Sequence, residues 1–224
     1  MSAIELVRCL SQAQIAFTAD QMRCRGPFDQ EFTVKLAKRF TFADTLMQST
    51  GGPVMWIYQN GVCKFSDTRK IPIVSAHGYE IEFSVVVDGA TADAIDVLQE
   101  LWTALGEIAE EEPRALDGSL GTFAYQTTAI VRLPKTYREL FPGLDLLARH
   151  TREGVDAPLT GAPGVETFHL ETRLSFAVGA ISLDRATVIQ PRHTSKADDR
   201  VFYTQSPLRS DRHLAMLEAL CAMD

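Results

Sequence analysis

Two stretches of the chain, Glu31 to Glu111 and Gly121 to Met223, have the same order of predicted elements. Each stretch is predicted to run through a strand, a short helix, a pair of hairpin strands, a further strand and a closing amphipathic helix. A repeated element order restricts the fold strongly, because each copy must bury its apolar surface in the same way. The expected fold class is α+β, with two pseudo-repeated lobes that each consist of a curved antiparallel sheet with helices on one face.

The predicted domain organisation follows from this repeat. Residues 1–30 are predicted to form an N-terminal helix and lead-in, because Ser2 and Glu5 have the spacing of a capping box. Residues 31–112 would form the first α+β lobe, and residues 121–224 the second. The connection between the lobes is short and mixed in composition, so we expect them to pack as one compact unit.

The start of the first lobe is predicted from periodicity and turn chemistry. Apolar and polar residues alternate from Glu31 to Phe40, and a period of two predicts a half-buried strand. The segment from Thr41 to Ser49 is predicted to be a short helix. Asn60-Gly61 then lies between two apolar segments, which predicts a hairpin, because both central residues of a type I′ turn have positive φ.

The remainder of the first lobe is predicted to contain two strands and a helix. Lys70 to Ala76 is predicted to be an edge strand, because Pro72 cannot donate a hydrogen bond to a ladder. Tyr79 to Val87 alternates again and predicts a strand with an apolar inner face. A helix follows from Thr91, with an apolar stripe made of Ile95, Leu98, Leu101, Trp102, Leu105 and Ile108.

The second lobe is predicted by the same signals. Thr122 to Leu133 alternates as a strand, and Pro134 ends it. A helix is predicted from Thr136, and the segment from Gly154 to Val165, with three Gly and two Pro, is predicted to be a connecting loop. Thr167 to Val178 alternates very regularly as a strand, and Ser210 is predicted to cap a final helix.

Composition restricts the partners and the compartment. The net charge is −7 and the pI is about 5.3, which does not favour nucleic acid, because affinity for phosphates comes from Lys and Arg. No stretch is apolar enough for a membrane span and no signal peptide is recognised, so we expect no membrane partner and a cytoplasmic protein. The four cysteines are far apart with no C-x-x-C pair. We therefore expect no metal site, disulfide framework or cofactor.

Three polar residues on one predicted strand face are the first candidate binding site. His169, Glu171 and Arg173 are spaced by two residues, so their side chains would lie on the same side of the strand. Such a row could polarise a ligand or relay a proton. A solvated polar face of an antiparallel sheet has the same pattern, and both interpretations are open at this point.

A polar loop is the second candidate site. The segment from Arg192 to Arg200 contains His193, Lys196 and Asp198, which could act as a base, a cation and an orienting carboxylate. Residues that are adjacent in one loop seldom form a preorganised catalytic site, because the groups must be aimed at one point from rigid supports. A solvated loop is the alternative interpretation.

Two functions are compatible with these patterns. The chain has no nucleophile elbow, phosphate-binding loop, dinucleotide-binding motif or zinc-protease motif, which disfavours an enzyme. We therefore expect a non-enzymatic protein-binding or assembly module that recognises a protein partner or itself through concave sheet faces or edge strands. The alternative is a small-ligand-binding protein or an enzyme with a pocket between the sheet and a helix, supplied by the two candidate sites above.

Overall fold

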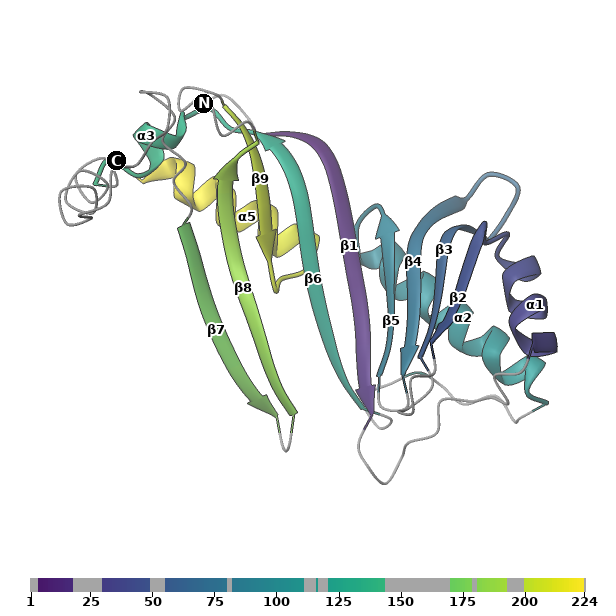
Figure 1. Cartoon of the computed structure of the whole chain (residues 1–224). Helices are drawn as coiled ribbons and strands as arrows, with labels where there is room; N and C mark the ends of the chain where they lie inside the picture. Colours follow the sequence, from purple (N-terminus) through teal and green to yellow (C-terminus); the bar gives the residue numbers. More distant parts are fainter. Residues whose placement is uncertain are drawn as a thin grey trace, which may run out of the picture. The chain divides into compact units, whose positions relative to one another are not determined.

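The structure is a computed structural model. The described residues have an α+β fold with a single antiparallel sheet (Figure 1). It describes residues 4–17, 30–48, 55–79, 82–110, 116, 121–143, 170–178, 181–192 and 200–223.

The chain divides into two compact units. The first unit comprises Leu10–Thr127 and Leu208–Ser210, and the second comprises Met1–Cys9, Thr128–Pro207 and Asp211–Asp224. Strands β1 (Glu5–Phe17) and β6 (Gly121–Arg132) contribute residues to both units. The strand order is β2-β3-β4-β5-β1-β6 in the first unit and β1-β6-β9-β8-β7 in the second.

In the first unit, the strands form one layer and the helices pack on one face of it (Figure 1). Its other elements are α1 (Gln30–Arg39), β2 (Asp44–Gln48), β3 (Met55–Lys64), β4 (Lys70–Tyr79), β5 (Glu82–Asp88) and α2 (Thr91–Ile108). Helix α2 is confirmed, with Leu98, Leu101, Trp102 and Leu105 of the predicted stripe buried. Its stripe packs on Phe83, Val85 and Val87 of β5, which alternate inward as predicted.

The predicted strand from Glu31 to Phe40 is wrong, because these residues form α1. Phe32, Leu36 and Phe40 are all buried and lie four residues apart, which is also a helical spacing. Val34 fits only the strand pattern, and it is 57% exposed. The segment predicted to be a short helix instead contains β2, whose five residues pair with β3.

The predicted N-terminal helix is also wrong. Glu5–Phe17 forms β1, which pairs antiparallel with β5 from Leu10 to Ala16. Ala13, Ile15 and Phe17 alternate along β1 and are buried in the core of the first unit. Cross-strand pairing over this length overrides a local capping signal, because helix propensity is weak compared with burial.

Asn60-Gly61 does not form the predicted hairpin turn, because β3 continues through it. Asn60 has a φ of 55°, and the backbone N–H of Val62 donates to the carbonyl of Phe40. A Cβ on Gly61 would overlap the ring of Phe42. The positive φ expected of Asn-Gly is therefore present, but it lies within a strand whose pairing with β4 keeps one register on both sides of Asn60, so the chain does not reverse there.

Strand β4 was predicted to lie at a sheet edge, but it lies between β3 and β5. Pro72 is exposed and pairs with Val62 of β3. Pairing with β5 begins only at Ile73, which lies opposite Val87. Pro72 is therefore beyond the end of the β5 ladder, where its missing N–H costs no hydrogen bond on that side.

Gly78 is the glycine on which we base a stability prediction. It lies opposite Trp56 in the β3–β4 ladder, and a Cβ would overlap the buried indole ring. We expect Gly78→Ala to lower the free energy of unfolding by about 1–3 kcal/mol, the usual cost of overpacking. Gly143→Ala is the matched control, because a Cβ there meets nothing within 4 Å. Denaturant melts that show equal stability for both variants would contradict this packing.

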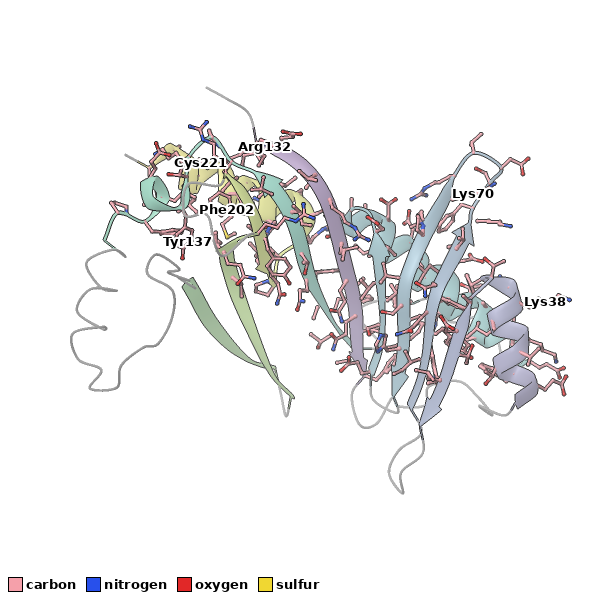
Figure 2. All side chains as sticks on the ribbon, turned by 45° about the horizontal axis from the view of Figure 1, so that its top comes forward. Lys38, Lys70, Arg132, Tyr137, Phe202 and Cys221 are labelled. Atoms are coloured by element: carbon pink, nitrogen blue, oxygen red, sulfur yellow. The ribbon has the colours of Figure 1, made fainter. Side chains whose placement is uncertain are left out.

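The second unit has its own core around α5 (Ser210–Ala222). Its remaining elements are α3 (Tyr137–Leu140), β7 (Leu170–Val178), β8 (Ile181–Pro191) and β9 (Val201–Ser206). The buried members of the core are Ala129, Val131, Leu133, Tyr137, Ile189, Phe202 and Leu217. Figure 2 shows Tyr137 and Phe202 in this unit, and their ring centroids are 6.2 Å apart.

Most element predictions for the second unit are confirmed. Strand β6, strand β7 and the helix from Ser210 lie where the sequence placed them. Thr136 caps α3, with its hydroxyl accepting a hydrogen bond from the backbone N–H of Glu139 at 3.4 Å. The two-lobe repeat itself is not confirmed, because its first copy would begin with α1 and its second with β6. It stays a prediction.

Candidate functional site

The face of the first unit that points away from α2 is the candidate site, and we call it the back face. Strand registers place one row of residues straight across it, from Gln14 through Ser84, His77 and Ile57 to Leu46. A second row runs beside it. The described residues of the back face are Leu10, Gln12, Gln14, Ala16, Asp44, Leu46, Ile57, Gln59, Ser75, His77, Glu82, Ser84, Val86 and Asp88.

Exposure increases along the row towards the edge strand β2. Gln14 and Ser84 are buried, His77 and Ile57 are half-buried, and Leu46 is 51% exposed. Leu46 is one of the few large apolar side chains in the described part of the chain that are this exposed. The β2 end of the back face therefore offers apolar surface next to a strand edge.

His77 is the ionisable group at the centre of the back face. It lies opposite Ser84 on one side and Ile57 on the other. Burial lowers the pKa of His77 from its ordinary value of 6.5, because the charged imidazolium loses solvation. At neutral pH it is a neutral imidazole with one donor and one acceptor, which suits hydrogen bonding to a peptide or an uncharged ligand.

A second polar cluster lies in the second unit, where α5 packs on β9. Nδ1 of His213 is 2.6 Å from the Ser206 hydroxyl, and Nε2 is 2.8 Å from the Thr204 hydroxyl. The Thr204 hydroxyl donates to the carbonyl of Ala129 at 3.2 Å, so towards His213 it acts as an acceptor. This assignment gives a neutral imidazole that donates from Nε2 and accepts from Ser206 at Nδ1.

The contact between Ser206 and His213 has the geometry of a nucleophile and a base. All three side chains of the cluster have no exposed surface, however. Burial also lowers the pKa of His213 to about 4, with no charged group contributing. A substrate has no access to a hydroxyl in this position, so the cluster is structural: it satisfies buried polar groups between β9 and α5.

The thiol of Cys63 on β3 is buried and is not poised as a nucleophile. Burial, followed by the nearby carboxylate of Glu100, raises the pKa of Cys63 to about 12. Cys63 therefore stays a protonated thiol at neutral pH, although Lys64 is its neighbour in the sequence. Among the described residues, no group of three or more His, Cys, Asp and Glu side chains could hold a metal ion.

The sequence-predicted site residues fall in β7 or outside the described residues. Glu171 and Arg173 belong to β7, where they lie opposite Val188 and Ala186 of β8. His169, His193, Lys196 and Asp198 lie outside the described residues. The two candidate sites drawn from the sequence are therefore still predictions.

Sequence reasoning missed both histidines of the clusters above. His77 was not selected, and it lies inside β4. His213 was not selected, although it lies four residues before Leu217 on the buried side of α5. The signal for His213 was present in β9, where Phe202, Thr204 and Ser206 share the buried face and become polar towards its end.

Comparisons of the chain with protein-family models, with curated proteins and with solved structures found no match. In the described part of the chain, no helix has the length and apolar character needed to cross a membrane.

Proposed function

We propose that the protein is a non-enzymatic protein-binding or assembly module, and that the back face with the adjoining edge of β2 is its binding surface. The observation that carries this proposal is the distribution of charge on the back face. Its charged residues are three carboxylates at its margins: Asp44 lies on the edge strand β2, and Glu82 and Asp88 are the first and last residues of β5. The other positions are aliphatic or neutral polar residues. Depletion of charged residues at the centre of a surface is typical of protein interfaces.

The edge of β2 supplies a second means of recognition. Strand β2 is the terminal strand of the order in the first unit and has five residues. A terminal strand offers backbone N–H and C=O groups to an added strand of a partner. A partner strand beside β2 would place its alternate side chains next to Leu46, so that backbone pairing and apolar contact act together.

The closest alternative is a small-ligand-binding protein. The space between the sheet and α2 is filled by Trp56, Phe83 and Trp102, which are at most 3% exposed. His77, half-buried and neutral on the back face, is the group that favours this alternative. A ligand there would be small and uncharged, because no cation is present among the residues of the back face.

Native mass spectrometry of protein purified gently from its source would test the proposal. We expect wild type and Val34→Lys to retain a protein partner and Leu46→Lys to lose it. Val34 is the matched control, since it is 57% exposed on α1 while Leu46 is 51% exposed on β2. A bare monomer would contradict the proposal. A monomer with a small adduct that His77→Ala removes would favour the ligand-binding alternative.

A further inference from the structure

Strands β1 and β6 bury the same succession of side chains. Each buries four alternate residues, which run from a hydroxyl side chain through alanine and a β-branched residue to a large apolar residue, and each of these is at most 3% exposed. The first set is Ser11, Ala13, Ile15 and Phe17, and the second set is Thr127, Ala129, Val131 and Leu133, the last of which directly follows β6. The two strands therefore match in the order, spacing and size of their buried residues.

The segment from β5 into α2 matches the segment from β9 into α5 in the same way, with no insertion or deletion between them. Strand β5 lies between β1 and β4, and β9 lies between β6 and β8. The buried residues at matching positions are Phe83 and Phe202, Val85 and Thr204, Val87 and Ser206, Thr91 and Ser210, Ala94 and His213, and Leu98 and Leu217.

The same hydrogen bond precedes both helices. The hydroxyl of Ser11 on β1 donates to the carbonyl of Gly89, two residues before α2 begins. The hydroxyl of Thr127 on β6 donates to the carbonyl of Leu208, two residues before α5 begins. Both bonds are 2.8 Å long. Alternating burial recurs wherever a strand packs on a helix, but a buried hydroxyl bond at the same place in both segments does not follow from it.

The first residues of α2 and α5 are equivalent in their contacts with each other. The backbone N–H of Thr91 donates to Oγ of Ser210 at 3.0 Å, and the backbone N–H of Ser210 donates to Oγ1 of Thr91 at 2.8 Å. Each residue thus gives and receives the same kind of bond, and each satisfies an N–H that has no partner within its own helix.

We propose that the segments from β1 to α2 and from β6 to α5 are two copies of one duplicated segment. The copies begin at β1 and β6, so they differ in extent from the repeat predicted from the sequence, whose first copy begins at Glu31. The duplication also accounts for the polar cluster of the second unit. Its members Thr204, Ser206 and His213 take the positions that Val85, Val87 and Ala94 occupy in the first copy.

This equivalence means that the second copy can replace its polar cluster by the three apolar residues of the first copy. Two valines are larger than threonine and serine together, and alanine is smaller than histidine, so the exchange nearly conserves side-chain volume. Removing all partners of a buried hydrogen-bond network at once can be nearly neutral, whereas removing one partner leaves the others unsatisfied. The three changes together are therefore expected to cost less than one of them alone.

Hydrogen exchange of the α5 amides in the full chain tests this expectation. We expect His213→Ala to lower their protection about tenfold or more, because it leaves a cavity and takes one partner from the hydroxyls of Thr204 and Ser206. The triple variant Thr204→Val, Ser206→Val and His213→Ala is expected to return the protection close to that of wild type. A triple variant protected no better than His213→Ala would overturn the inference.

The reciprocal exchange in the first copy is an independent test that does not depend on the folding of the second unit. Ala94→His inserts a ring at a position with no exposed surface and is expected to lower the midpoint of denaturant unfolding, measured by tryptophan fluorescence. Adding Val85→Thr and Val87→Ser makes room for the imidazole and supplies its two hydroxyl partners, so we expect the midpoint to recover. A triple variant less stable than Ala94→His would also overturn the inference.

Discussion

Replacement of Phe83 by alanine is expected to lower the free energy of unfolding of the first unit by about 3–5 kcal/mol, the usual cost of deleting a buried aromatic ring. Phe83 has no exposed surface and lies between the two tryptophans of the chain. Its ring centroid is 5.5 Å from that of Trp56 and 6.3 Å from that of Trp102. The substitution therefore removes contacts to β3 and α2 together and leaves a cavity between rigid rings.

Tryptophan fluorescence during denaturant unfolding measures this loss, because both indoles belong to the first unit. Val86→Ala is the control on the same strand, since Val86 is half-buried on the back face and is expected to lose about 1 kcal/mol. A Phe83→Ala variant as stable as Val86→Ala would show that the aromatic cluster does not form the core of this unit.

The second unit is expected to lose roughly 3 kcal/mol of stability as the pH falls from 6.5 towards 4, through His213. Burial lowers the pKa of His213 to about 4, whereas the unfolded chain has the ordinary value of 6.5. The unfolded state therefore binds the proton more tightly. The contribution of His213 to the free energy of unfolding is fully present above pH 6.5. Between pH 6.5 and pH 4 it decreases by about 1.4 kcal/mol for each pH unit.

The comparison with His213→Gln isolates this effect. Glutamine retains a donor and an acceptor for Thr204 and Ser206 but does not ionise. Carboxylates titrate equally in both proteins, so the difference between their pH profiles reports His213. Hydrogen exchange of α5 measures the second unit, and tryptophan fluorescence of the first unit is the internal control. Parallel pH profiles for the two proteins would contradict the buried neutral imidazole.

The clearest elements of the fold were predictable because their signals were long or redundant. Helix α2 has an apolar stripe from Ile95 to Ile108, about four helical turns, and Leu98, Leu101, Trp102 and Leu105 within it are buried as predicted. Thr136 caps α3 with its hydroxyl, and α5 begins at the predicted residue, Ser210. In each case local propensity and burial agree, so no tertiary information was needed.

Shorter signals failed where two structures satisfy the same pattern. Phe32, Leu36 and Phe40 fit both a strand and a helix, and the exposure of Val34 distinguishes them only in the folded chain. Asn60-Gly61 fits both a hairpin turn and a bend within β3, since each requires a positive φ. Long-range pairing decided both cases, because the ladder partners of a strand are not encoded in its own sequence.

The candidate site was beyond sequence reasoning for a related reason. The back face is defined by registers that align residues from five strands, and Gln14 and Leu46 at its ends are distant in the chain. No single strand shows which residues share this surface, or that its charged residues lie only at its margins. His213 likewise depends on Thr204 and Ser206 arriving from β9.

The sequence by itself determined the α+β class, the long amphipathic helix α2 and the positions of β6, β7 and α5. Those properties arise from neighbouring residues in the chain, through periodicity, capping and local charge. Only the tertiary structure decided that residues 5–17 form a strand, that β4 lies inside the sheet and that β7 lies at its end. Strand order and register depend on the burial of surfaces from distant segments, and that free energy exists only when those segments are brought together.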